Sequence, residues 1–196
     1  MSLEEDEINL ETSIRKLKKK LNLGCGGDIR RSSEEDWVNL DFIQGNGVDV
    51  VHDLEKTPYP FNDHEFDYII AQNIIEHLDN FTGAIEEITR ILKKKAILEI
   101  IVPYHSQEVS EFHKRLFRYN SFSVSNITNL ERIKLFGSFK VLGRKIIFRK
   151  NFPFWLNIIP EAIFNLHPKI ALFYEYTCLR NLFPGYLIKY KLVKNS

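Results

Sequence analysis

Five short apolar runs, each ending at a glycine, a proline or a polar residue, dominate the first half of this sequence. They cover residues 21–23, 37–40, 48–51, 66–71 and 96–102. Short runs bounded by turn-forming residues are typical of β-strands. Between the fourth and fifth runs, Ile85, Ile88, Ile91 and Leu92 recur at helical spacing. This alternation predicts an α/β fold built around a mostly parallel sheet.

The second and third predicted strands lie unusually close together in the sequence. Only residues 42–47 separate them, whereas a parallel crossover usually needs about a dozen residues or more. Either the helices early in the sheet are trimmed, or the strand register differs from this prediction. If they are trimmed, the sheet face there needs another cover. The charged helix expected from about Asn9 or a second subunit are the two alternatives.

The 196 residues favour one domain with an appendage, because domains average roughly 150 residues. We expect residues 1–18 to form a charged N-terminal helix or extension and residues 19–196 to form the domain. Within it, residues 140–148 alternate as a strand does, and 186–193 read as the final strand. Residues 148–185 are rich in aromatic residues and broken by prolines. We expect short helices there that form core and a lid; a dimer surface or a membrane-interface patch are less favoured.

Charge and cysteine content exclude several classes of protein. The chain has 27 basic and 26 acidic residues, a net charge of +1, so nucleic acid is not an expected partner. Two cysteines give no disulfide framework and suggest a reducing compartment, the cytoplasm. The longest apolar run, residues 96–102, is far shorter than the roughly 18 residues of a membrane span. The acidic N-terminus does not resemble a signal peptide.

Gly24-Cys25-Gly26 follows the first run and permits a tight turn that approaches a ligand closely. The next strand ends at Asp41, which is expected to be exposed there and to accept hydrogen bonds from ribose hydroxyls. The third strand ends at Asp53, where a carboxylate can accept from an exocyclic amine. Phe42 and Leu54 follow these two acids and are expected to sandwich a flat base. Together these features predict an adenosine site.

The type of adenosine cofactor follows from what the turn lacks. A dinucleotide fingerprint needs a third glycine where this chain has Ile29, and the Gly-Lys-Ser/Thr of a phosphate loop is absent. A ligand with adenine, ribose and an amino-acid tail fits better than one with a pyrophosphate. A nicotinamide-dependent oxidoreductase is therefore disfavoured, and an NAD titration tests it.

Several segments in combination resemble the small class I S-adenosylmethionine-dependent methyltransferases of the type 11 kind. They are LNLGCGG (21–27), VNLD (38–41), DL (53–54), residues 58–70 and IEHL (75–78). The resemblance runs from about residue 19 to residue 103. It implies a Rossmann-like seven-stranded sheet whose last strand is antiparallel. The cofactor it implies is S-adenosylmethionine.

The resemblance also assigns roles to single residues. It places Gly24 and Gly26, with Cys25 between them, beside the methionine tail of the cofactor. It places Asp41 on the ribose and Gln72 near the amino group of the tail. By the same resemblance Asp53 and Leu54 meet the adenine.

Methyl transfer from a sulfonium is an in-line displacement that mainly needs alignment and exclusion of water. An oxygen acceptor also needs its proton removed. His113, with Glu111 beside it to orient the ring, is the favoured base, and His105 is the second candidate. Tyr104 is considered as a wall of the acceptor pocket. For His77 a packing or capping role is favoured.

The remaining candidates are read as structural. Cys25 is expected to contribute its backbone rather than act as a nucleophile, and Cys178 is expected in the core. His52-Asp53 and His64-Glu65 match no established ligand spacing, so no metal site is predicted.

The predicted function is methyl transfer to a small-molecule or glycan-type acceptor. The alternative is a non-catalytic partner subunit that binds S-adenosylmethionine. Glu111-Phe112, in place of the Asp-Pro that this family usually carries there, favours that alternative.

Overall fold

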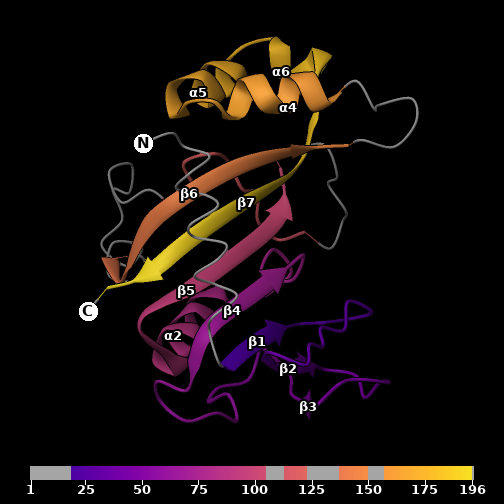
Figure 1. Cartoon of the computed structure of the whole chain (residues 1–196), viewed down its shortest axis with the longest axis vertical. Helices are drawn as coiled ribbons and strands as arrows, with labels where there is room; N and C mark the ends of the chain where they lie inside the picture. The colour runs from indigo at the N-terminus through magenta and orange to yellow at the C-terminus, as the bar shows by residue number, and fades with distance from the viewer. Residues whose placement is uncertain (1–18, 105–112, 123–136, 150–156, 196) are drawn as a thin grey trace.

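The computed structural model describes residues 19–104, 113–122, 137–149 and 157–195. They form one seven-stranded sheet with the order β3-β2-β1-β4-β5-β7-β6 (Figure 1). The strands are β1 (Lys19–Leu23), β2 (Asp36–Asp41), β3 (Val50–Val51), β4 (Phe66–Gln72), β5 (Leu92–Pro103), β6 (Phe139–Phe148) and β7 (Gly185–Lys194). Strands β1 to β5 pair in parallel, and β7 is antiparallel to both β5 and β6. The predicted Rossmann-like sheet with an antiparallel last strand is confirmed.

The helices early in the sheet are trimmed, as one of the two alternatives predicted. Residues 24–35 between β1 and β2, and residues 42–49 between β2 and β3, form turns and bends with no helix. Strand β3 still pairs in parallel with β2, with Leu40 opposite Val50. The expected N-terminal helix or extension, residues 1–18, lies outside the described residues.

Two buried asparagines hold the connection from β1 to β2 against the sheet. Asn22 and Asn39 are opposite each other in register, and Asn22 Nδ2 donates to Asn39 Oδ1 at 3.1 Å. Asn22 also donates to the Asp28 carbonyl at 2.6 Å, and Arg30 N donates to Asn39 Oδ1 at 2.9 Å. Asp49 Oδ2 accepts from Asn39 N at 2.8 Å. These bonds satisfy backbone groups that a helix would have paired internally.

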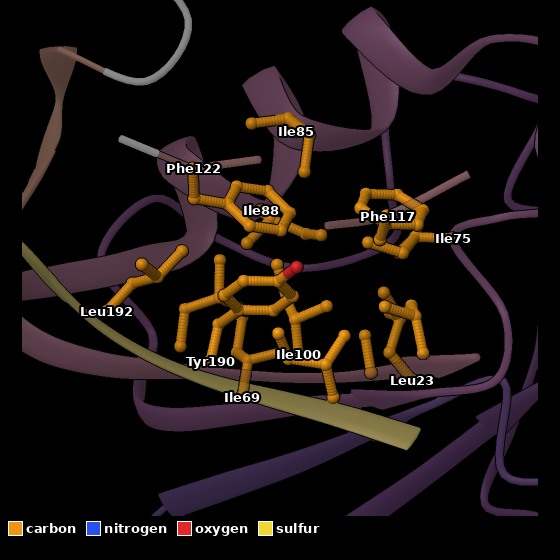
Figure 2. Close-up of a cluster of buried hydrophobic side chains, with 14 of the residues drawn as sticks. Leu23, Ile69, Ile75, Ile85, Ile88, Ile100, Phe117, Phe122, Tyr190 and Leu192 are labelled. Atoms are coloured by element: carbon orange, nitrogen blue, oxygen red, sulfur yellow. The ribbon is translucent and has the colours of Figure 1, made fainter. Parts of the chain in front are cut away.

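Helix α2 (Phe81–Ile91) covers one face of the sheet (Figure 1). Its side chains Ile85, Ile88 and Ile91 are fully buried, as the helical spacing in the sequence predicts. Figure 2 shows Ile85 and Ile88 above side chains of the central strands, with Tyr190 of β7 among them. The helix begins at Asn80, whose side chain accepts from Gly83 N at 3.1 Å.

The C-terminal third adds three short helices near the β6 edge (Figure 1). They are α4 (Ile158–Asn165), α5 (Pro168–Tyr176) and α6 (Leu179–Leu182). Phe164 of α4 and Tyr174 of α5 pack with ring centroids 4.4 Å apart, and Gly185 N donates to the Tyr174 hydroxyl at 2.9 Å. Among the described residues no helix has the length and apolar character to cross a bilayer. Cys178 is exposed before α6, so the expected core position is wrong.

Candidate functional site

The glycine turn after β1 requires glycine for two separate reasons. Gly24 and Gly26 have φ values of +65° and +50°, in the left-handed region where other residues are strained. A Cβ at Gly24 would also lie 2.6 Å from Cγ1 of Ile74. Between them, Cys25 N donates to the Leu40 carbonyl at 2.9 Å. The turn is therefore folded against the end of β2.

Asp41 closes this turn from the neighbouring strand. Its Oδ2 accepts from Gly26 N at 2.7 Å, and its Oδ1 accepts from Ile43 N at 3.1 Å. The residue is only 8% exposed, so the expectation of an exposed strand-end carboxylate is wrong. The backbone amides of the turn and of the next loop enclose it. A carboxylate has about four acceptor sites, so capacity remains for ligand hydroxyls.

A cleft of about 250 Å³ opens at this end of the sheet. It is lined by Asn22, Gly24, Cys25, Gly26, Gly27, Asp28, Gln72 and Asn73. Four residues from the predicted cofactor set, Gly24, Cys25, Gly26 and Gln72, are therefore brought together. Asp41 adjoins the cleft through its bond to Gly26.

The residues predicted to meet the base lie at the ends of β2 and β3. His52 N donates to the Asp41 carbonyl at 2.9 Å, which keeps these two strand ends side by side. The Asp53 side chain is 44% exposed, and Phe42 is exposed. Leu54 is buried in the main hydrophobic cluster. Of the two walls predicted for a flat base, Phe42 is the accessible one.

Sequence reasoning missed Asn22, Asp28 and Asn73 as lining residues of the cleft. The sequence does carry a signal for Asn22, because an amide side chain within a short apolar strand needs a hydrogen-bond partner outside that strand. The second asparagine, Asn39, stands at the matched position of the next strand. The connection from β1 to β2 also contacts Gln72, because Gln72 Oε1 accepts from Arg30 Nη2 at 3.4 Å.

Cys25 is buried, and burial together with the charge of Asp41 raises the pKa of its thiol. A protonated buried thiol is a poor nucleophile, which agrees with the expectation that the turn uses the Cys25 backbone.

A second group of polar residues follows β4, next to the cleft. Residues 113–115 run alongside residues 76–79, because Lys114 N donates to the Glu76 carbonyl at 2.9 Å and Arg115 donates to the Leu78 carbonyl. This brings the rings of His77 and His113 to a centroid separation of 4.8 Å. In the same turn as His77, burial raises the pKa of the Glu76 carboxyl.

The other acceptor-side predictions have different outcomes. His77 does not cap α2, because Asn80 occupies the N-cap position. Tyr104 is 2% exposed and donates to Glu175 Oε1 at 3.2 Å, so it does not line an open pocket. His105 and Glu111 lie outside the described residues.

Residues 21–100 match a family described as "Methyltransferase domain". The fold is similar to an S-adenosylmethionine-dependent methyltransferase from Archaeoglobus fulgidus, with a TM-score of 0.59, 14% identity and coverage of 97% of this chain and 94% of that one. A methyltransferase in complex with the Trm112 activator from Haloferax volcanii gives a TM-score of 0.57, 13% identity and coverage of 99% and 95%.

A third structure is the Burkholderia thailandensis 1,6-didemethyltoxoflavin-N1-methyltransferase with bound S-adenosylhomocysteine. It gives a TM-score of 0.56, 10% identity and coverage of 98% of this chain and 77% of that one. No curated protein sequence matches this chain. At these identities the solved structures show the fold alone, and the family match covers 80 of the 196 residues.

Proposed function

We propose that the chain is a class I methyltransferase that uses S-adenosylmethionine and transfers the methyl group of this cofactor to a small or sugar-like acceptor by in-line displacement. The observation that carries this proposal is the glycine turn closed by Asp41, at 2.7 Å from Gly26 N, beside an open cleft. An uncharged turn of this kind suits an amino-acid tail and a ribose. The domain supplies alignment and exclusion of water, since the sulfonium already activates the methyl group.

We assign the cofactor contacts residue by residue. Gly24, Cys25 and Gly26 flank the methionine tail, and Gln72 lies near its amino group. Asp41 accepts from the ribose hydroxyls with the acceptor sites that Gly26 and Ile43 leave free. At the neighbouring strand ends, Phe42, Asp53 and Leu54 form the adenine end of the site.

The acceptor is placed beyond the carboxyl ends of β4 and β5. His113 is the described histidine that we propose to act on it. Residues 148–185 are proposed as a lid, which fits the position of Tyr174 and Glu175 against the end of β5. The near-zero net charge offers no nucleic-acid surface, so a small or glycan-type acceptor is favoured. Two unpaired cysteines fit a cytoplasmic location.

The first test is thermal melting with S-adenosylhomocysteine, with NAD as the control ligand. A ligand at about 100 times its dissociation constant stabilises the folded state by roughly 2.7 kcal/mol. For a chain of this size, that corresponds to a rise of about 5–10 °C in the melting temperature. A rise with S-adenosylhomocysteine alone supports the site. No rise with either ligand, in a folded sample, overturns it.

Turnover is tested separately, by mass spectrometry of acceptor pools incubated with S-adenosylmethionine. Sugars and small hydroxylated metabolites are expected to gain a methyl group. The alternative is a non-catalytic subunit that binds S-adenosylmethionine beside a partner. Cofactor binding with no product from any pool supports that alternative.

A further inference from the structure

Three potential metal ligands meet beside the cofactor cleft. Glu76, His77 and His113 each bring a ligand atom within 4.8 Å of the others. Glu76 and His77 come from the turn after β4, and His113 comes from the segment that Lys114 N fastens to the Glu76 carbonyl. A backbone hydrogen bond between residues 38 positions apart therefore holds the group together, which is why no local ligand spacing reveals it.

Glu76 is the unusual member of this group. Its side chain is 1% exposed, and neither carboxylate oxygen accepts a hydrogen bond from the part of the chain that the structure describes. The nearest ring nitrogen, Nε2 of His77, lies 3.9 Å from Oε1, beyond hydrogen-bond length. A buried carboxylate without donors is unfavourable in its charged form. A bound cation removes that penalty.

The position of the group connects it to the proposed reaction. Gln72 and Asn73 line the cofactor cleft, and Glu76 follows only three residues later. Ile74, between them, packs against Gly24 of the glycine turn. An ion held by Glu76 would therefore lie next to the end of the cleft at which an acceptor must approach.

We propose that Glu76, His77 and His113 bind one divalent transition-metal ion, whose open coordination positions receive the hydroxyl of the acceptor. Two imidazoles and one carboxylate suit zinc, cobalt or manganese ions, and three protein ligands leave open positions, as catalytic sites do. Ligand atoms around a tetrahedral ion lie about 3.4 Å apart. Rotation of the two partly exposed imidazoles closes the remaining gap.

This role of the ion rests on the proposed methyl transfer. The ion lowers the pKa of the bound hydroxyl, whose proton passes to water. The acceptor oxygen then forms a bond to the methyl carbon while the carbon–sulfur bond breaks. The electron pair of that bond stays on sulfur, which becomes the neutral thioether of S-adenosylhomocysteine. His113 thus acts as a ligand, in place of the general base that the sequence suggested.

The test is calorimetric titration of the untagged, chelator-stripped chain with Zn²⁺, and absorption spectroscopy with Co²⁺. We expect one ion per chain and visible Co²⁺ bands of nitrogen–oxygen coordination. Glu76→Gln and His113→Ala should each weaken binding by about tenfold or more, since even outer-shell changes cost 10–100-fold. Glu76→Gln keeps the size of the buried side chain. This variant therefore tests the site even if His113→Ala does not fold.

The matched control is His167→Asn. His167 lies at the N-cap of α5, where its ring accepts from Lys169 N, and asparagine also caps helices well. This variant removes a histidine elsewhere and should bind the ion as the unaltered chain does. Equal loss in the control, no ion bound by the unaltered chain, or full binding by both site variants overturns the metal site.

Binding of S-adenosylhomocysteine is measured on the same samples. Cofactor binding without ion binding overturns the metal site alone. Ion binding without cofactor binding overturns the proposed function and leaves the metal site standing.

Discussion

Asp41 joins local folding to the proposed cofactor binding through a single carboxylate. Its two oxygens accept from Gly26 N and Ile43 N. We therefore expect Asp41→Ala to weaken S-adenosylhomocysteine binding by more than tenfold, roughly the worth of a charged hydrogen bond. It should also lower the free energy of unfolding by about 1–3 kcal/mol. Calorimetry and urea unfolding measure the two effects. An unchanged dissociation constant would show that Asp41 is not part of the site. Asp41→Asn should lower the free energy of unfolding less than Asp41→Ala does.

Gly24 is constrained by both its backbone angle and its neighbour. Gly24→Ala places a Cβ 2.6 Å from Cγ1 of Ile74 at a φ of +65°, so we expect a loss of about 1–3 kcal/mol in stability and loss of cofactor binding. Gly27→Ala is the matched control, because no atom lies within 4 Å of a Cβ built there. Thermal melting compares the two. Equal melting temperatures would contradict the strained geometry assigned to the turn.

At the scale of elements, the connection from β1 to β2 depends on Asn39. Asn39→Ala leaves Arg30 N and the Arg30 carbonyl without the side chain that pairs them. It also removes one of the two hydrogen bonds of Asn22 Nδ2 and one of the two of Asp49 Oδ2. Buried polar groups that lose partners cost about 1–3 kcal/mol, so we expect a loss of roughly 2–3 kcal/mol together with faster amide exchange over residues 24–35. Denaturant unfolding and hydrogen exchange test this. Unaltered exchange would show that other contacts hold the connection.

Helix α2 carries an acid-sensitive link to the loop before β4. Glu87 Oε2 accepts from Tyr59 N at 2.6 Å and from Arg90 Nη2 at 2.7 Å. The hydrogen bonds from Arg90 lower the pKa of Glu87 more than burial raises it. A carboxyl with a lowered folded-state pKa stabilises the fold above its unfolded pKa of roughly 4.3, and this contribution disappears as pH falls through the lower folded value.

We therefore expect Glu87→Gln to lower the melting temperature at pH 7 by roughly 3–6 °C. The difference from the unaltered chain should shrink as pH falls below about 4. Glu86→Gln, on the exposed side of the same helix, is the control and should change little at any pH. A difference that stays constant with pH would contradict the role given to the ionised Glu87.

The elements themselves were predictable because their signals are local. Apolar runs and the Ile85–Ile88–Ile91 spacing follow from the chain alone, and they correspond to β1–β5 and α2. The site was predictable only in part. Residue type and position at a strand end predict Gly24 and Asp41 as site residues. The burial of Asp41, however, depends on two backbone amides that only the folded chain brings together. The pairing of His113 with Glu76 depends on a contact between residues 37 positions apart, which no local pattern encodes.

At the scale of the whole molecule, Glu175 ties the C-terminal helices to the sheet. Its Oε1 accepts from the Tyr104 hydroxyl at the end of β5 at 3.2 Å and from Tyr119 N at 2.9 Å. The sequence left Tyr104 as a candidate pocket wall because it follows a strand, and the contact of Tyr104 with Glu175 of α5 has no local sequence signal. The same limit applies to Cys178, whose apolar neighbours suggested a core position that the packing of α6 does not provide.

Glu175→Ala should therefore cost about 2–4 kcal/mol, because it removes the carboxylate oxygen that accepts from two buried donors. If the C-terminal helices cover the acceptor, turnover should fall more than cofactor affinity does. Tyr176→Ser, at a neighbouring side chain that is 72% exposed, is the control. Urea unfolding and steady-state kinetics separate the two effects. A stability equal to that of the control would show that Glu175 does not connect these parts.

The strand order β5-β7-β6 has a consequence for synthesis on the ribosome. Strand β6 emerges before β7, yet β7 lies between β5 and β6 and pairs with both. Until residue 194 has left the exit tunnel, the nascent sheet ends at an open β5 edge and β6 has no sheet partner. Open strand edges invite pairing with other chains. Until β7 is synthesised, the growing polypeptide therefore exposes the β5 edge to pairing with other chains.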